Sequence, residues 1–126
     1  MKIGCGTDII EISRIRQSIE QFGDVFIKKI FTQSEISYCE GKNIAKYQHY
    51  AARFAAKEAI YKAINNFEKI ENADFLDAEI INGINGKPSI RFCNKLEYMN
   101  MYHADISISH CKEYAMAMVI IMGEDA

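Results

Sequence analysis

Apolar and small residues recur at two different spacings near the start of the chain, and these spacings predict a strand followed by a helix. Residues 2–9 alternate between two faces, which is typical of a β-strand. Gly4 and Gly6 share one of these faces, so we expect another backbone to approach it closely. Residues 12–22 then place isoleucines at helical intervals, which predicts an amphipathic helix that ends at Gly23.

The middle of the chain carries further helix signals. An apolar and basic stretch at 26–31 predicts a single helical turn. The sequence T-Q-S-E at 32–35 is a capping box, so a new helix is expected to start there and to stop near Gly41. Residues 42–48 are basic and polar, which indicates a connection. A long helix is predicted at 48–66.

The second half of the chain changes from helical to alternating or continuous apolar patterns. Strands are predicted at 75–81, 89–92, 104–110 and 114–122, with a turn at 82–88 and a helix at 94–102. The last strand is apolar at nearly every position, which is typical of the centre of a sheet. The pattern therefore predicts an α+β fold in which an antiparallel sheet packs with the long helix.

Length and composition narrow the class of protein. The chain has 126 residues, which favours one domain covering 1–126, and 49% of the residues are hydrophobic. A net charge of −2 argues against non-specific nucleic-acid binding, which needs a basic surface. We expect no membrane association, because no apolar run is long enough to span a bilayer and no signal peptide is visible. The four cysteines form no metal or redox motif, so a cytoplasmic protein with reduced thiols is expected.

The long helix contains the first candidate for chemistry, R-F-A-A-K-E-A-I-Y-K-A at 53–63. At about 100° per residue, Glu58 and Lys62 share the side that carries the small and apolar residues. Only Arg53, Lys57 and Ile64 point the other way. Two interpretations follow: Glu58 and Lys62 form an ordinary surface ion pair, or they belong to a buried charged site that needs a partner or a metal.

Asp8 is the second candidate, because it lies at the end of the first predicted strand. A cap or turn aspartate is one interpretation. The other pairs Asp8 with Glu58, since two carboxylates with waters and substrate phosphates are the usual ligands of Mg²⁺. Lys62 would then offset the charge of a phosphate bound to that metal.

Two shorter motifs in the second half also have alternative interpretations. G-K-P at 86–88 is either a plain hairpin turn or part of a binding loop. S-I-S-H at 107–110 ends a predicted strand, and His110 is either a surface histidine or, together with Ser109, a hydrogen-bonding group for a phosphate.

The order and spacing of these motifs resemble a known family. The motifs are G-x-G-T-D-I at 4–9, T-x-x-E at 32–35, R-F-A-A-K-E-A at 53–59 followed by K-A, then G-K-P and S-I-S-H. Together they resemble the bacterial holo-[acyl-carrier-protein] synthases, which belong to the 4′-phosphopantetheinyl transferases. The resemblance covers essentially the whole chain, and it implies the fold of that superfamily.

The resemblance also implies an activity and its cofactors. Such an enzyme moves the 4′-phosphopantetheine group of coenzyme A onto a serine of apo acyl carrier protein and releases adenosine 3′,5′-bisphosphate. By resemblance, Asp8 and Glu58 hold Mg²⁺ and Lys62 contacts the phosphates. Glu58, or a metal-bound water near it, is the expected acceptor of the serine proton. The expected coenzyme A contacts, including Lys46 at the 3′-phosphate, are Lys46, Arg53, Lys62, Gly86, Lys87, Pro88, Ser109 and His110.

The resemblance implies partners as well. The family is typically a homotrimer in which Asp8 and Glu58 come from one subunit and His110 from its neighbour. Arg14 matches the arginine that docks the acidic acyl carrier protein. Arg16, Lys28 and Lys29 would extend this basic patch, or they form an ordinary solvated face.

The chain departs from the family pattern at three places. Cys5 stands where the family often has an aliphatic residue. Residues 64–67, I-N-N-F, replace a glycine-rich turn, which asparagine in a left-handed conformation would preserve. The basic stretch 42–49, which contains Lys46, lies where the family binds the 3′-phosphate.

Two other functions use parts of the same motifs. A Mg²⁺-dependent hydrolase of nucleotide pyrophosphates would share Asp8, Glu58 and Lys62, and it would release bisphosphate without a carrier protein. A non-catalytic module that binds carrier proteins would need Arg14 but neither carboxylate. Neither alternative accounts for the full order of motifs.

Overall fold

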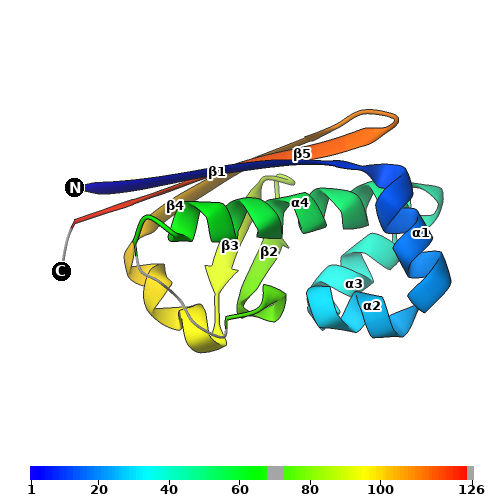
Figure 1. The fold of residues 1–126 in the computed structure, drawn as a ribbon, viewed down its shortest axis with the longest axis horizontal. Helices are drawn as coiled ribbons and strands as arrows, with labels where there is room; N and C mark the ends of the chain where they lie inside the picture. The colour runs from blue at the N-terminus through cyan, green and yellow to red at the C-terminus, as the bar shows by residue number, and fades with distance from the viewer. Residues whose placement is uncertain (68–72, 125–126) are drawn as a thin grey trace.

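The computed structural model describes residues 1–67 and 73–124, which fold into the predicted α+β arrangement (Figure 1). The helices are α1 (Ile12–Phe22), α2 (Asp24–Ile30), α3 (Gln33–Glu40) and α4 (Lys46–Ile64), with 3₁₀ turns at η1 (Asn43–Ala45), η2 (Phe75–Asp77) and η3 (Asn94–Met101). The strands are β1 (Lys2–Glu11), β2 (Ala78–Asn82), β3 (Pro88–Phe92), β4 (His103–His110) and β5 (Tyr114–Gly123).

The strands form two antiparallel sheets rather than one. The larger sheet has the order β1-β5-β4, so the apolar β5 is central as predicted, and β2 pairs only with β3. Helix α4 runs lengthwise beneath the larger sheet, with the β2–β3 hairpin on its other side (Figure 1). Helices α1, α2 and α3 gather near the N-terminal end of α4.

Several predicted boundaries change for local reasons. The strand predicted at 75–81 begins only at Ala78, because Asp74 and Asp77 form a capping box that folds η2 first. The helix predicted at 94–102 is a 3₁₀ helix. Helix α2 is seven residues long instead of a single turn, and α3 starts with the predicted Thr32–Glu35 capping box.

The end of α4 also differs from expectation. Asn65 follows the helix in a right-handed conformation, with φ −52° and ψ −24°. The non-glycine residues with positive φ in the described ranges are instead Asn43 and Asn94. The turn expected at 64–67 is present at 65–67, but it forms without a left-handed asparagine.

Close contact between β1 and α4 positions the site. A Cβ atom on Gly4 would lie 2.1 Å from the carbonyl oxygen of Ala63, and one on Gly6 would lie 1.9 Å from that of Ala59. The glycines are thus required for the close backbone approach that the sequence predicted. Asp8 is the next residue on the same face of β1, so it is brought against the next turn of α4.

The orientation predicted for α4 is only partly right: its alanines are buried as expected, but so are the residues that were expected to face away. Arg53, Lys57 and Ile64 were expected to face away from the core, yet they are only 3%, 0% and 1% exposed. The Lys62 side chain is 53% exposed and Glu58 is half-buried. A helical wheel assumes one buried face, whereas the middle of α4 is covered by the larger sheet on one side and by α3 and β2 on the other.

Candidate active site

Asp8, Glu58 and Lys62 come together between β1 and α4. The Lys62 Nζ lies 3.3 Å from Asp8 Oδ1 and donates a 2.9 Å hydrogen bond to the carbonyl of Thr7. Burial raises the pKa of Glu58, and the nearby Asp8 carboxylate raises it further while Lys62 opposes the shift. Asp8 and Glu58 are therefore near enough to interact electrostatically, and their pairing at a metal stays a prediction.

Two simpler interpretations of these residues fail on the geometry. The residue that precedes α1 in the N-cap position is Glu11, which makes no side-chain cap, and Asp8 lies three residues earlier inside β1. Asp8 is thus not a helix cap. The ion pair that the structure shows for Lys62 is with Asp8 on β1, rather than with Glu58 one turn away on the same helix.

The donor set fits a hard divalent cation. Two carboxylates face a single ammonium group, so the site has an excess of negative charge. No cluster of three or more His, Cys, Asp or Glu side chains suited to a metal occurs within 1–67 and 73–124. A pair of carboxylates suits Mg²⁺, which keeps several waters and takes further oxygens from a bound phosphate. Asp8 and Glu58 are the residues that would hold it.

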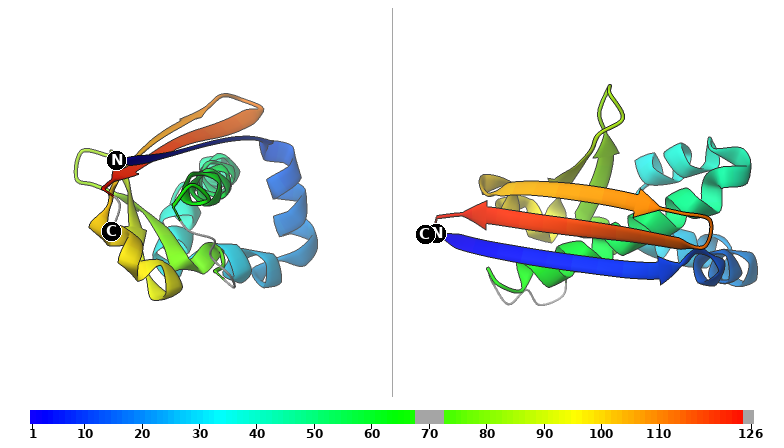
Figure 2. Two further views of the ribbon diagram at one scale, coloured as in Figure 1. Left: turned by 60° about the vertical axis from the view of Figure 1, so that its left-hand side comes forward. Right: turned by 90° about the horizontal axis from the view of Figure 1, so that it is seen from above.

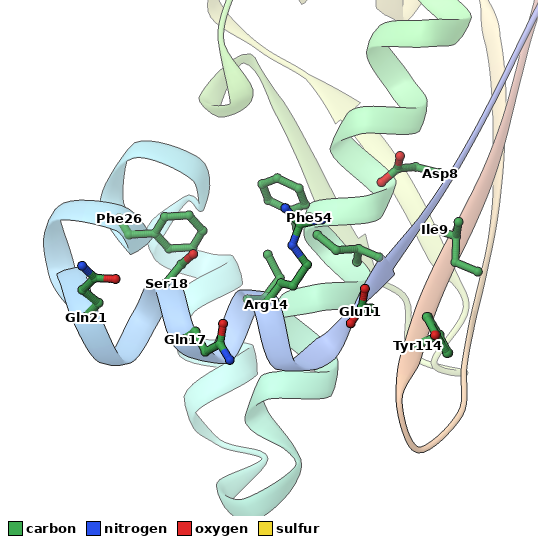
Figure 3. Close-up of a pocket in the computed structure, with 12 residues that line it drawn as sticks. Asp8, Ile9, Glu11, Arg14, Gln17, Ser18, Gln21, Phe26, Phe54 and Tyr114 are labelled. Carbon is green, nitrogen blue, oxygen red and sulfur yellow. The ribbon is translucent and has the colours of Figure 1, made fainter.

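A cavity of about 640 Å³ opens beside Asp8 (Figure 3). Its polar lining includes Arg14 and Gln17 of α1, and its apolar lining includes Phe26 of α2 and Phe54 of α4. The Asp8 carboxylate points toward α4 at one end of this cavity (Figure 3). The predicted docking arginine and the predicted metal ligand thus line the same cavity.

The other predicted docking residues lie elsewhere. Arg16 pairs with Glu20 at 3.3 Å, and its guanidinium lies 5.3 Å from the centre of the Tyr47 ring. Lys28 is 3.9 Å from Asp24, and Lys29 is exposed on α2. Neither Arg16 nor the two lysines line the cavity beside Asp8.

A second polar cluster forms around Arg53. Its guanidinium stacks 4.0 Å above the Tyr38 ring, and Nη2 donates to the side-chain oxygen of Asn82. Its Nε is buried and has no hydrogen-bond partner among the described residues. The His49 ring lies 5.5 Å from Tyr38 and 5.9 Å from His110, measured between ring centres. Leaving a buried guanidinium donor without an acceptor is costly, so this cluster has unused capacity for an anion.

The charge of this cluster is positive. The pKa of His49 is lowered, first by burial and then by the positive charges of Arg53, Lys42 and His110. His49 and Lys42 were missed as individual site residues, although both fall in the basic stretch 42–49. Lys46, which was chosen from that stretch, instead lies 3.5 Å from Glu40 and 5.3 Å from the Tyr47 ring centre.

The remaining residues predicted to bind coenzyme A lie around the β2–β3 turn and the end of β4. Gly86 adopts φ +82° in the turn, and its carbonyl accepts a hydrogen bond from Asn82, the partner of Arg53. Lys87 is 3.8 Å from Asp105 on β4. Pro88 begins β3, and Ser109 and His110 end β4.

One chain does not bring these two clusters together. Asp8 is on β1 and His110 on β4, which are the opposite edges of the larger sheet. Viewed from above, the β2–β3 turn projects on the β4 side, away from β1 (Figure 2). Asp8 and the predicted coenzyme A contacts on β4 and in the β2–β3 turn therefore lie toward opposite edges of the larger sheet, whereas Lys62 lies with Asp8.

Comparison with known proteins identifies the family. The sequence pattern of the 4′-phosphopantetheinyl transferase superfamily matches residues 4–119. The chain belongs to this superfamily. Among its relatives, the holo-[acyl-carrier-protein] synthase of Ruminiclostridium cellulolyticum is 46% identical over 96% of this chain and 92% of the relative. That of Protochlamydia amoebophila is 40% identical over 95% of this chain and 98% of the relative.

Solved structures of the superfamily share the fold. The Bacillus anthracis holo-(acyl-carrier-protein) synthase in complex with CoA (3′,5′-ADP) is 34% identical with a TM-score of 0.77, covering 96% of this chain and 97% of that one. The Helicobacter pylori enzyme in complex with coenzyme A is 31% identical with a TM-score of 0.79, covering 94% and 99%. These confirm the family and the fold class expected from the motifs. No helix in 1–67 or 73–124 has the length and apolarity to cross a membrane.

Proposed function

We propose that this chain transfers 4′-phosphopantetheine from coenzyme A to a serine of apo acyl carrier protein, releasing adenosine 3′,5′-bisphosphate. The observation that carries the proposal is the meeting of Asp8 and Glu58 beside Lys62, in a chain of this superfamily. Phosphoryl transfer depends on neutralising charge and on positioning, which is what such a site offers.

The direct test is the mass of apo acyl carrier protein after incubation with the enzyme, Mg²⁺ and coenzyme A. We expect a gain of one phosphopantetheine group. Release of bisphosphate from coenzyme A without carrier protein would indicate a hydrolase instead. No reaction, together with carrier-protein binding that survives loss of both carboxylates, would indicate a binding module.

The roles of the metal-site residues follow from their placement. Asp8 and Glu58 would hold Mg²⁺, which when bound there neutralises charge on the pyrophosphate of coenzyme A. Lys62 is exposed enough to leave Asp8 and donate to a phosphate oxygen. The attacking hydroxyl belongs to the carrier protein, and Glu58 is the half-buried carboxylate beside it that would accept its proton.

The Arg53 cluster would bind a phosphate at the nucleotide end of coenzyme A. Arg53 offers a buried Nε that lacks an acceptor, and His49, His110 and Lys42 add positive charge. The β2–β3 turn, which Asn82 links to Arg53, would form one wall. In this proposal, Lys42 and His49 of the basic stretch 42–49 would contact the 3′-phosphate in place of Lys46.

The carrier protein would dock at the cavity that joins Arg14 to Asp8. Arg14 would meet an acidic side chain there, and the apolar wall of Phe26 and Phe54 would accept an apolar one. Arg16 and Lys28 are held by acidic neighbours on other faces, so they would add only long-range attraction.

The chain would act as a homotrimer, because one chain separates the two halves of the site. A substrate that contacts both Asp8 and His110 must lie between the β1 edge of one copy and the β4 edge of another. The outer face of the larger sheet is also apolar and uncovered. It includes Ile3, Ile9, Met116, Met118 and Met122, each between 37% and 66% exposed.

A mixing experiment tests the shared site. An Asp8→Asn chain and a His110→Ala chain should each be weakly active, whereas their mixed oligomers contain sites with both native residues. We expect the mixture to recover activity, and light scattering to give three times the chain mass of 14.4 kDa. Activity no greater than the sum of the two variants would contradict a shared site.

A further inference from the structure

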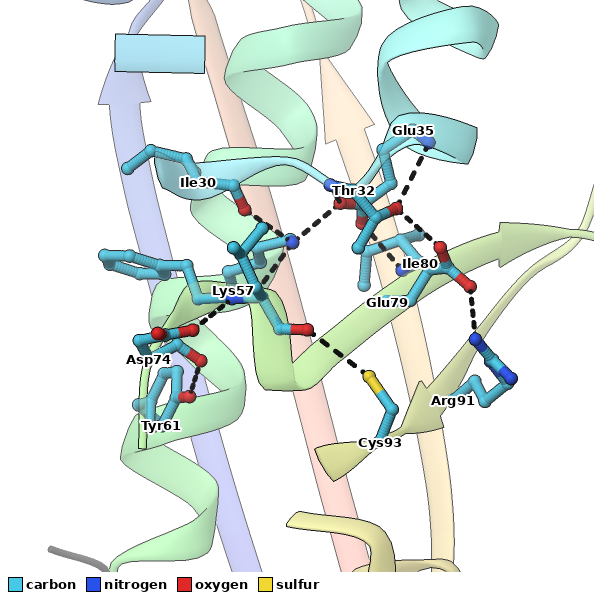
Figure 4. Close-up of polar contacts among 12 residues, drawn as sticks. Ile30, Thr32, Glu35, Lys57, Tyr61, Asp74, Glu79, Ile80, Arg91 and Cys93 are labelled. Carbon is cyan, nitrogen blue, oxygen red and sulfur yellow. Dashed lines mark hydrogen bonds and ion pairs between the residues drawn. The ribbon is translucent and has the colours of Figure 1, made fainter. Parts of the chain in front are cut away.

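Lys57 lies on α4 directly before Glu58, and its ammonium group is entirely enclosed. Its side chain and that of Glu35 are both 0% exposed, and Nζ is 2.6 Å from Glu35 Oε1 (Figure 4). Nζ also donates to the carbonyls of Ile30 at 2.7 Å and Phe75 at 2.8 Å. All three ammonium hydrogens thus have an acceptor.

The partners of Lys57 are themselves fixed. Two of the acceptors are backbone carbonyls: that of Ile30 at the end of α2 and that of Phe75 at the start of η2. Glu35 is the third residue of α3 and completes the capping box with Thr32. Its two carboxylate oxygens accept 2.8 Å hydrogen bonds from the backbone of Thr32 and of Ile80. The ammonium group therefore joins α4 to three separate segments, α2, α3 and η2.

This anchor lies on the side of α4 that faces away from β1. On the β1 side, Gly6 leaves no space between the strand and Ala59. Glu58 lies one turn before Lys62, whose Nζ is 3.3 Å from Asp8. A rotation of α4 that withdrew Glu58 from Asp8 would also carry Lys57 away from its three acceptors.

We propose that Lys57 is a positioning residue: its buried ammonium group fixes the rotation of α4 and so holds Glu58 beside Asp8. An apolar residue would fill the same space without directional contacts, and it would let the two carboxylates separate. A buried charge whose partners are all in place resists displacement strongly, because any movement leaves it unpaired. This inference rests on the proposed metal site. Its test uses metal binding, because the affinity for the metal depends on how close the carboxylates of Asp8 and Glu58 lie.

The test measures binding of Mn²⁺, as a probe for Mg²⁺, to the oligomer without coenzyme A, by electron paramagnetic resonance. The variant Lys57→Met keeps the length and removes the charge. We expect its Mn²⁺ dissociation constant to rise at least tenfold. The matched control is Leu96→Ala, which truncates a fully buried side chain of η3 in the core cluster that also contains Ala59 of α4, and which leaves the contacts of Lys57 in place. It should lower the melting temperature yet keep the wild-type metal affinity.

The outcomes separate the inference from the proposed function. Wild-type protein that binds no Mn²⁺, or that binds it equally with Asp8→Asn, would overturn the metal site itself. Native metal affinity in Lys57→Met, or equal losses in Lys57→Met and Leu96→Ala, would overturn the positioning role alone. Should Lys57→Met fail to fold, Glu35→Gln decides: it removes the charged acceptor, keeps the two carbonyls, and should weaken Mn²⁺ binding by several-fold.

Discussion

The close approach of β1 and α4 makes Gly6→Ala a sharp test of how the site is assembled. The new Cβ would lie 1.9 Å from the Ala59 carbonyl oxygen and 2.9 Å from the Ala63 amide nitrogen. Both are backbone atoms of a helix, so neither can rotate away. To restore ordinary contact at 3.4 Å or more, the strand and the helix must separate by about 1.5 Å.

The separation should affect stability and turnover together. Overpacking of this kind costs about 1–3 kcal/mol of unfolding free energy. Asp8 follows two residues after Gly6 and Glu58 precedes Ala59, so the shift acts directly on the carboxylate pair. A misplacement of about 1 Å in reacting groups can cost about 100-fold in rate, and we expect a loss of that order in kcat.

The assay combines thermal unfolding with carrier-protein modification measured well below the melting temperature. Gly41→Ala is the matched control, because a Cβ there has no neighbour nearer than 3.4 Å and the backbone is right-handed, with φ −68°. It should be neutral or slightly stabilising. Native turnover in Gly6→Ala would refute the argument that this contact sets the Asp8–Glu58 distance.

Three further predictions address the proposed roles. Arg14→Glu should raise the KM for acyl carrier protein about tenfold and leave that for coenzyme A nearly unchanged; an equal loss for both substrates would contradict docking at this residue. Glu58→Gln should lose turnover even with saturating Mg²⁺ but melt at a higher temperature, because it removes the repulsion with Asp8; full turnover would contradict its role. Coenzyme A affinity should rise by up to about tenfold as pH falls from about 8 to about 6. The pKa of His49 is lowered in the ligand-free protein, and a bound phosphate would favour its protonated form. Calorimetry should show a smaller dependence of the affinity on pH for His49→Phe than for the wild type.

Local sequence signals predicted most of the elements because they act over short distances. The Thr32–Glu35 capping box, the strand alternation before Asp8 and the apolar strand at 114–122 all correspond to elements of the structure. The predicted start of β2 at residue 75 was wrong, because the Asp74–Asp77 capping box forms a 3₁₀ turn there and the strand begins only at Ala78.

The environment of α4 could not be read from its sequence. Lys57 reads as a surface residue because a buried lysine needs acceptors, and its acceptors come from segments 18 to 27 residues away in the chain. The burial of Arg53 could not be predicted for the same reason, because its partner Asn82 is 29 residues away in the chain. Asp8 and Glu58 were paired on the chemistry of Mg²⁺ ligands and on the family resemblance, and their spacing in the sequence could not show that they meet. The structure adds that the glycines of β1 let that strand approach α4 closely.

The spacing within α4 turns two of its functional candidates, Arg53 and Glu58, toward different sides of the helix. At about 100° per residue, Arg53 and Glu58 point roughly 140° apart around the axis, whereas Arg53 and Lys57 are separated by only about 40°. Glu58 therefore faces the β1 edge, while Arg53 faces α3 and the β2–β3 hairpin on the side of β4. In the proposed trimer, each group would meet a ligand that a second copy of the chain also contacts. The rotation of α4, which we propose Lys57 to fix, would then set the positions of both groups.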